Sequence, residues 1–246
     1  MDFRLDGKVA IVTGASRGIG AAVARELARV GASVVVAARG ADSLMKVAGS
    51  LEGRGLSVAT DVSRIEDLER LVAATVDAYG GVDVLVNNAG VAPPAKQIYA
   101  VSLEEWQSTL DVNVRAAWYL SNLCHPHMKS RGGGAVVNIA STSGLHHDIG
   151  LGVYSISKAA VIMLTTVCAK EWARDRIRVN ALAPGIVRTE LAAPLIEYME
   201  THGQKPNPLN LVGDPDEIAR LVRFLATEES RYITGDVIRI DGGEII

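Results

Sequence analysis

A tyrosine and a lysine four residues apart could carry acid–base chemistry in this sequence of 246 residues. Tyr154 and Lys158 begin the stretch 154–175, which predicts a helix, so their side chains would share one helix face. A phenol has a pKa of about 10, and a neighbouring ammonium lowers that pKa by favouring the phenolate. The pair could therefore exchange a proton with a carbonyl or alcohol oxygen. Taken alone, such a pair is more often an ordinary helix surface.

A glycine-rich turn near the N-terminus could bind an anionic group. Residues 13–20 read TGASRGIG, follow the apolar run 9–12, and open a segment with helical spacing of apolar residues. Gly14, Gly18 and Gly20 would let the chain turn sharply and let a ligand approach the backbone amides at the helix N-terminus. These amides suit a pyrophosphate. The spacing differs from the common dinucleotide fingerprint, so this turn alone is a weak signal.

Strands alternate with helices along the chain that must position these groups. Apolar runs predict strands at 9–12, 34–38, 57–60, 84–86, 135–139, 178–181 and 237–240. Capping boxes from Ser63 and from Ser102, and Asp214 before Pro215, predict helix starts, and the helix from Ser102 should run to about Met128. We therefore predict an α/β fold, a doubly wound parallel sheet of about seven strands flanked by helices on both faces, in a single domain over residues 1–246.

One segment departs from this alternation. Residues 189–211 contain a short amphipathic stretch with Leu191 and Leu195, followed by the polar, proline-bearing run 203–208. An apolar helix with polar ends suits a mobile segment that covers a substrate pocket. An ordinary surface excursion is the alternative.

Composition argues against several classes of protein. A net charge of -3 without a basic block argues against a nucleic-acid partner. No apolar run approaches the length of a membrane span and the N-terminus does not resemble a signal peptide, so we expect a cytoplasmic protein without membrane contact. Cys124 and Cys168 support neither a disulfide framework nor a zinc site, and we expect no metal.

Read together, the motifs resemble those of the short-chain dehydrogenase/reductase family, in its single-domain branch. The matching features are TGxxxGIG from Thr13, Asp61, NNAG at 87–90, Asn113, Ser141, YxxxK at Tyr154 and Lys158, and PGxxxT from Pro184 to Thr189. They occur in the family's order over essentially the whole chain. The resemblance implies a Rossmann-type sheet and an NADP(H)-dependent oxidoreductase that interconverts a ketone and a secondary alcohol by hydride transfer.

The resemblance also implies a role for each catalytic residue. Tyr154 would be the acid/base, and Lys158 would lower its pKa and hold the nicotinamide ribose. Ser141 would hydrogen-bond the reacting oxygen. Asn113 would hold a water that links Lys158 to solvent.

Binding residues follow from the same resemblance. Cofactor contacts are implied for Gly14, Ser16, Arg17, Gly18, Ile19, Gly20, Arg39, Asp61, Val62, Asn88, Ala89, Gly90, Tyr154, Lys158, Pro184, Gly185, Val187 and Thr189. Candidate substrate contacts are Ser143, Leu145, His147, Leu151 and Leu191. Ser143 could instead be a turn residue, and Asp61 could merely cap a strand end.

The choice of cofactor depends on the end of the second predicted strand. An acidic residue there would bind the ribose 2′-hydroxyl and repel a 2′-phosphate, but the sequence has Ala38 followed by Arg39. Arg39 and Arg17 could both pair with a phosphate, which favours NADP(H), with NAD(H) as the alternative.

Two other functions stay open at this point. The chain also resembles 3-oxoacyl-(acyl-carrier-protein) reductase, and Arg131, Arg174 and Arg176 could form a basic face for an acidic carrier. A nucleotide-binding regulator without catalysis is the alternative from another class. The expected partners are a small carbonyl or alcohol substrate and, by family resemblance, three further copies of the chain in a homotetramer.

Overall fold

Seven parallel strands form one sheet in the computed structural model, which describes residues 3–52, 54–147 and 149–245. Their order across the sheet is β3-β2-β1-β4-β5-β6-β7. The strands are β1 (Val9–Thr13), β2 (Ser33–Ala38), β3 (Gly55–Ala59), β4 (Val84–Asn87), β5 (Gly134–Ile139), β6 (Ile177–Pro184) and β7 (Val237–Ile240). The predicted doubly wound, Rossmann-type sheet is confirmed.

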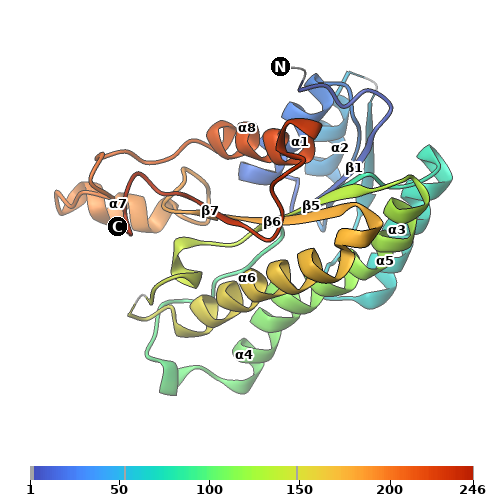
Figure 1. The fold of residues 1–246 in the computed structure, drawn as a ribbon. Helices are drawn as coiled ribbons and strands as arrows, with labels where there is room; N and C mark the ends of the chain where they lie inside the picture. Colours follow the sequence, from blue (N-terminus) through green and yellow to red (C-terminus); the bar gives the residue numbers. More distant parts are fainter. Residues whose placement is uncertain (1–2, 53, 148, 246) are drawn as a thin grey trace.

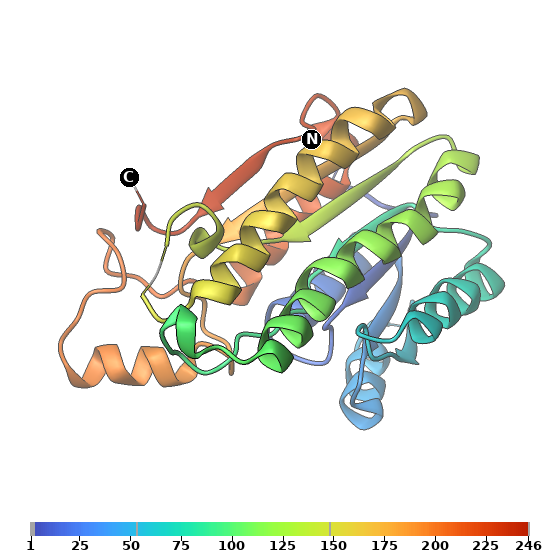
Figure 2. The same ribbon diagram turned by 90° about the horizontal axis from the view of Figure 1, so that it is seen from below.

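Helices cover both faces of this sheet (Figure 1). They are α1 (Gly18–Arg29), α2 (Ala41–Gly49), α3 (Ile65–Tyr79), α4 (Leu103–Leu110), α5 (Ala116–Ser130), α6 (Gly152–Trp172), α7 (Ala193–Thr201) and α8 (Pro215–Ala226). One face packs against α1, α2 and α8, and the other packs against α3, α5 and α6. Seen from below, α5 and α6 run along the same face (Figure 2).

The two faces explain why the strands are continuous apolar runs. In β1, Ala10 and Val12 join the core under α1 and α8, whereas Ile11 joins the core over α3, α5 and α6. A strand covered on both sides needs apolar residues at every position. The second core also buries Cys124 of α5 and Cys168 of α6, both as free thiols.

The strand order places the candidate site. The chain winds from β1 through β2 to β3 toward one edge and from β4 to β7 toward the other, so the order reverses between β1 and β4. In such sheets, ligands bind beyond the carboxyl ends of the strands at this switch point. The loops after β1, β4, β5 and β6 therefore meet at one edge.

The predicted long helix from Ser102 is interrupted. Its capping box is confirmed, because the Ser102 hydroxyl accepts from the Glu105 amide (3.1 Å) and the Glu105 carboxylate accepts from the Ser102 amide (2.9 Å). Between α4 and α5, however, Asp111–Arg115 forms one π turn. The helix then continues through Pro126 to Ser130.

The prediction of a capping box at Ser63 is wrong. The Ser63 hydroxyl donates to the Asp61 carboxylate (2.7 Å), and α3 begins after Arg64 without a side-chain cap. The local hydrogen bond within the turn thus replaces the cap.

One helix corrects the expectation that no stretch is apolar enough to span a membrane. Gly152–Asp175, which is α6 and the turn after it, has the length and composition of a spanning helix. This helix packs on the sheet through Val161 and Cys168 and buries Lys158. The core helix of a globular domain meets the same criterion, so this is weak evidence for a membrane span.

Candidate active site

The glycine-rich turn after β1 is folded tightly around Asn88. Gly14 and Gly18 have positive φ angles of +64° and +53°, which favour glycine. A Cβ on Gly20 would collide with the Gly14 carbonyl and would lie 2.6 Å from the Asn88 amide nitrogen. That nitrogen donates to the carbonyls of Thr13 (2.8 Å) and Gly14 (3.2 Å). Asn88, which directly follows β4, therefore holds the turn in place through its side-chain amide.

Thr13, the last residue of β1, holds the loop after β4 in return. Its hydroxyl accepts hydrogen bonds from the amides of Asn88 and Ala89, both at 3.0 Å. The turn after β1 and the loop after β4 are thus fixed to each other at the switch point. The sequence analysis gave Thr13 no role, although a hydroxyl residue at the end of a buried strand is a usable signal.

The start of α1 suits an anionic group. The residue before it, Arg17, is the N-cap and makes no side-chain cap, so the first amides of the helix have no side-chain acceptor there. Ser16 is half-buried beside them, and Ile19 packs on the core. The Thr189 methyl would lie 3.2 Å from a Cβ on Gly18, so Thr189 packs against the turn. The glycine-rich turn and Thr189, which the family resemblance links to one cofactor, are therefore neighbours.

Lys158 is buried beside Tyr154. Its ammonium donates to the Ile139 carbonyl (2.8 Å) and lies 5.6 Å from the centre of the Tyr154 ring. Burial lowers the pKa of Lys158 from its usual 10.5 to about 8. A Cβ on Gly90 would lie 3.4 Å from this ammonium, so Gly90 leaves room for it. The predicted pair thus shares one helix face, with its cation inside the protein.

Asn113, in the π turn, connects three segments. Its side-chain oxygen accepts from the Val91 amide (2.8 Å), and its nitrogen donates to the Val91 carbonyl (2.9 Å) and to the Ser157 hydroxyl (2.9 Å). A π turn inside a helix often marks a functional site. The amide group fixes the loop after β4 to α6, and the water contact expected of Asn113 stays a prediction. Ser157, next to Lys158, was not identified from the sequence.

Ser141 lies just beyond β5, at the start of a turn that packs against α6. Its hydroxyl accepts from the Ser143 amide (3.2 Å) at the start of a 3₁₀ turn, Thr142–Gly144. A Cβ on Gly144 would lie 2.7 Å from the Lys158 carbonyl carbon, so this turn packs directly on α6. Ser143 is buried in the turn, in agreement with the structural alternative.

The chain after β6 completes the cleft. The Gly185 amide donates to the Ile240 carbonyl (3.1 Å), directly after Pro184 at the end of β6. Val187 is buried and pairs with Gly213 in an isolated bridge. The Thr189 hydroxyl donates to the Val187 carbonyl (3.3 Å). Residues 184–189 therefore pass from the sheet edge to the glycine-rich turn.

The residues expected to contact the adenosine make their contacts with other parts of the protein or face solvent. The Asp61 carboxylate accepts from the amide (3.0 Å) and hydroxyl (2.7 Å) of Ser63, which fits the cap of a strand end, and Val62 is buried. Arg39 is exposed. Arg17, the other arginine expected to meet a phosphate, pairs with Glu190, and both side chains are exposed.

The candidate substrate residues come from the loop after β5 and from the segment after β6. Leu145, His147 and Leu191 are exposed, and Leu151 is half-buried. The loop before α6, which contains Leu145, His147 and Leu151, is fixed where the Lys96 amide donates to the Gly150 carbonyl (3.0 Å).

A groove of about 580 Å³ lies at the C-terminal ends of α5 and α6, away from Tyr154. Its lining residues are His125, Lys129, Lys170, Glu171, Trp172, Arg174 and Asp175. Across residues 3–52, 54–147 and 149–245, no cluster of three or more His, Cys, Asp or Glu side chains could hold a metal ion.

Comparison with known proteins identifies the family. Residues 14–244 match a family model described as enoyl-(acyl carrier protein) reductase. The chain is 40% identical to dehydrogenase/reductase SDR family member 4 from Bos taurus over 98% of this chain and 88% of that protein. This chain belongs to the short-chain dehydrogenase/reductase family.

Other members of the short-chain dehydrogenase/reductase family are equally extensive matches. The 3-oxoacyl-(acyl-carrier-protein) reductase FabG of Thermotoga maritima is 37% identical over 99% of this chain and all of its own length. The crystal structure of L-sorbose reductase from Gluconobacter frateurii, complexed with NADPH and L-sorbose, superposes with a TM-score of 0.93 at 34% identity, over 99% of this chain and 98% of that one. The family's oxidoreductase fold thus spans the whole chain.

The burial of Lys158 predicts a pH dependence of stability for the protein without cofactor. Between pH 8 and pH 10.5 the unfolded chain still binds a proton that the folded chain has released, so the free energy of unfolding should rise with pH. Wild type should gain up to about 3 kcal/mol relative to Lys158→Met over this window. Urea denaturation at several pH values measures this difference.

The exposed Lys170, on the same helix, supplies the control. Lys170→Met should track wild type across the window. A constant difference between wild type and Lys158→Met would contradict the lowered pKa.

Proposed function

We propose that this family member is an NADP(H)-dependent reductase that interconverts a ketone and a secondary alcohol, with Tyr154 as the acid/base. The observation that carries the proposal is the buried Lys158 ammonium, 5.6 Å from the Tyr154 ring at the switch point of the sheet. Burying a cation lowers the free energy of unfolding, so a cation held inside the protein beside a phenol is better explained by a role in proton transfer.

The residues at this edge fit a nicotinamide dinucleotide. The uncapped start of α1 and the glycine-rich turn would hold the pyrophosphate, and Lys158 would donate to the ribose hydroxyls. Gly90 and residues 184–189 would border the nicotinamide end. When bound, this cofactor supplies or accepts the hydride.

The side chains of the protein would manage the proton. In reduction, the Tyr154 hydroxyl gives its proton to the substrate oxygen as negative charge develops there, and in oxidation the phenolate takes it back. The Lys158 ammonium beside the ring would favour the phenolate form of Tyr154. Ser141 donates a hydrogen bond to the same substrate oxygen. Asn113 keeps the loop after β4 and Ser157 in place around Lys158.

Arg39 favours the phosphorylated cofactor. No carboxylate stands at Ala38 to bind the ribose 2′-hydroxyl, and the exposed Arg39 follows at the end of β2. Arg17 has first to leave Glu190, but an exposed ion pair is worth only about 0–1 kcal/mol, so a phosphate dianion can compete. L-sorbose reductase is complexed with NADPH in its crystal structure, whereas a 7α-hydroxysteroid dehydrogenase with the same TM-score of 0.93 is complexed with NADH, so NAD(H) remains the alternative.

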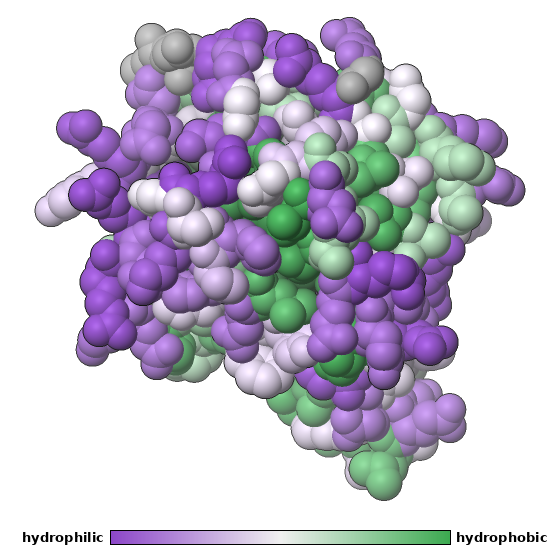
Figure 3. Space-filling model, turned by 90° about the vertical axis from the view of Figure 1, so that its right-hand side faces the viewer, coloured by the Kyte–Doolittle hydropathy of each residue, from purple (hydrophilic) through white to green (hydrophobic). Residues whose placement is uncertain are grey.

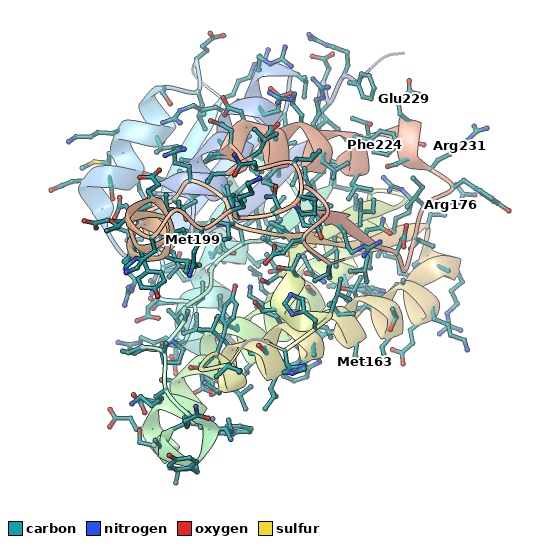
Figure 4. The ribbon with its side chains drawn as sticks, turned by 90° about the vertical axis from the view of Figure 1, so that its left-hand side faces the viewer. Met163, Arg176, Met199, Phe224, Glu229 and Arg231 are labelled. Carbon is teal, nitrogen blue, oxygen red and sulfur yellow. The ribbon has the colours of Figure 1, made fainter. Side chains whose placement is uncertain are left out.

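Residues 189–211 would act as the mobile cover of the substrate. Helix α7 buries Ile196, whereas Leu191 and Leu195 are exposed. Met199 lies on the same helix (Figure 4). Exposed apolar side chains next to a cleft gain burial when the segment closes over a ligand.

We further propose a homotetramer. Ile156, Met163 and Val167 form an exposed apolar row on α6, and Met163 projects away from the sheet (Figure 4). Ile98 and Leu103 are also exposed apolar residues, and a lobe with green surface protrudes at the bottom of Figure 3. Apolar surface of this kind marks contacts between subunits.

The carrier-protein alternative keeps some support. The match to the 3-oxoacyl-(acyl-carrier-protein) reductase of Thermotoga maritima favours it. However, the guanidinium of Arg131, which is an exposed residue like Arg174 and Arg176, donates to the buried Asp83 carboxylate (3.0 Å) and to the Gly7 carbonyl (3.1 Å), so it is held within the domain.

A regulator without catalysis would not need Ser141, Tyr154, Lys158 and Asn113 together, so the enzyme is preferred. A cytoplasmic location and the absence of a nucleic-acid or membrane partner stay predictions.

Replacing Tyr154 with phenylalanine removes the proton donor and keeps the ring. Reduction of ketones should fall by at least about 100-fold, the usual contribution of a general acid. Loss of NADPH absorbance would be followed with β-ketoacyl thioesters, diketones, cyclic ketones and keto sugars. Tyr232→Phe, at a fully exposed tyrosine, is the control and should keep full activity. NADPH binding by wild type without turnover of any of these compounds would favour the regulator.

Arg39→Asp should reverse the cofactor preference. The ratio of kcat/KM for NADPH to that for NADH should fall at least about tenfold, because a charged hydrogen bond is lost and a carboxylate repels the phosphate. Glu190→Gln should tighten NADPH binding up to about fivefold by releasing Arg17 and leave NADH binding unchanged. Arg25→Asp, on the exposed side of α1, is the control. An unchanged ratio in Arg39→Asp would refute the assignment.

Sedimentation velocity tests the homotetramer. Wild type should sediment as a tetramer, and Met163→Glu should dissociate it because a carboxylate would be buried in the contact. Met45→Glu is the matched control, since Met45 on α2 is 56% exposed and Met163 is 63% exposed. A wild-type protein with the mass of a monomer would contradict the proposal.

A further inference from the structure

We propose that Ser157 is a positioning residue for the reaction, because its hydroxyl fixes the first turn of α6, and with it Tyr154, against the π turn that contains Asn113. The inference rests on the proposed function and adds to it a residue that acts through Tyr154. The motif YxxxK leaves the position of Ser157 unspecified.

The Ser157 hydroxyl makes two hydrogen bonds of opposite sense. It donates to the Tyr154 carbonyl (2.7 Å), one turn earlier in α6, and it accepts from the Asn113 side-chain nitrogen (2.9 Å). A serine hydroxyl has one proton to donate and lone pairs to accept, so the two bonds do not compete. Ser157 and Asn113 are 0% and 3% exposed, which keeps bulk water away from both bonds. The backbone of Tyr154 is therefore connected through Ser157 to the π turn.

The start of α6 needs such a connection. The helix begins at Gly152, and its N-cap residue is Leu151, whose side chain has no group that could accept from the first amides. Glycine is also a poor helix former. Tyr154 lies in this first turn, and helix ends fray. A hydrogen bond from Ser157, one turn further along, therefore limits the movement of Tyr154.

Asn113, the other end of this connection, is itself held in place. Its side-chain oxygen accepts from the Val91 amide (2.8 Å), and its nitrogen donates to the Val91 carbonyl (2.9 Å) as well as to Ser157. Both hydrogens of that nitrogen are thus used. Figures 1 and 2 show α6 beside the chain that runs from α4 into α5, which includes the π turn. The loop after β4 is in this way linked to the first turn of α6.

Tyr154 and Lys158 are held by different partners. The Lys158 ammonium donates to the Ile139 carbonyl at the end of β5 (2.8 Å), whereas Ser157 holds the Tyr154 carbonyl. The distance of 5.6 Å between the ammonium and the centre of the Tyr154 ring depends on both connections. Because electrostatic attraction weakens with distance, a displaced phenolate would gain less from the cation. Ser157 thus controls one of the two positions on which the proposed proton transfer depends.

Thr165 offers a matched comparison on the same helix. Its hydroxyl donates to the Val161 carbonyl (2.8 Å) and accepts from the Asn138 side-chain nitrogen (2.9 Å). Thr165 is buried as completely as Ser157, but it lies about two helical turns beyond Lys158. A merely structural role predicts the same consequences for the loss of either hydroxyl, whereas positioning predicts an effect on Tyr154 for Ser157 alone.

Ser157→Ala and Thr165→Val remove the two hydroxyls, and both should unfold at a lower urea concentration than wild type. Only Ser157→Ala should lower kcat for ketone reduction, by at least about tenfold, because a misplacement of about 1 Å can cost about 100-fold. KM for NADPH should stay near the wild-type value, since Asn113 keeps its bonds to Val91. Ser157→Thr keeps the hydroxyl and should keep most of the wild-type kcat.

The ionisation of Tyr154 gives a readout that needs no turnover. Nuclear magnetic resonance of protein isotopically labelled at the tyrosine rings follows this ionisation during a pH titration, and Tyr154→Phe assigns the signal. In Ser157→Ala, Tyr154 should ionise at a pH about 1 higher than in wild type, because a nearby opposite charge moves a pKa by about 1–3 and part of this effect is lost. Thr165→Val should titrate like wild type.

The two readouts separate this inference from the proposed function. Identical titrations of Tyr154 in wild type and Ser157→Ala, or an equal loss of kcat in Ser157→Ala and Thr165→Val, would overturn the positioning role and leave the reductase intact. A wild type that reduces no ketone would count against the proposed function, and the titration would still decide whether Ser157 positions Tyr154.

Discussion

A positive charge inside the protein is the constraint around which this edge of the sheet is built. An ammonium removed from water needs acceptors and close packing, since an unpartnered charge would unfold its surroundings or lose its proton. The carbonyl of Ile139 supplies one acceptor, and Gly90 and Asn113 surround the same point. Lys158 can be held there only if β5, the loop after β4 and α6 keep their relative positions.

A second polar network fixes those positions. The Asn87 side-chain amide donates to the Ser121 hydroxyl (3.0 Å) and to the Asn138 side-chain oxygen Oδ1 (2.9 Å), and the Asn138 side-chain nitrogen donates to the Thr165 hydroxyl (2.9 Å). All of these side chains are buried. Because a buried amide loses free energy when a partner is missing, the network admits one arrangement of β4 and β5 against α5 and α6.

Local patterns in the sequence predicted the strands, because burial on both faces makes each one a continuous apolar run. Ser102 was predicted correctly and Ser63 was not, since both have the spacing of a cap but only Ser63 has a competing acceptor two residues earlier, in Asp61. The π turn at Asn113 could not be predicted, because a long apolar face is compatible with an unbroken helix. The pair of Arg17 with Glu190 joins residues far apart in the chain, and no periodicity reports such a contact.

The burial of both cysteines has a chemical consequence for handling the protein. The thiolate is the form that reacts, and burial raises the pKa of Cys168 to about 11 and moves the pKa of Cys124 further in the same direction. With little thiolate and no access, the folded chain resists alkylation and oxidation at neutral pH. The rate at which a thiol reagent does modify these sulfurs therefore measures how often α5 and α6 separate from the sheet.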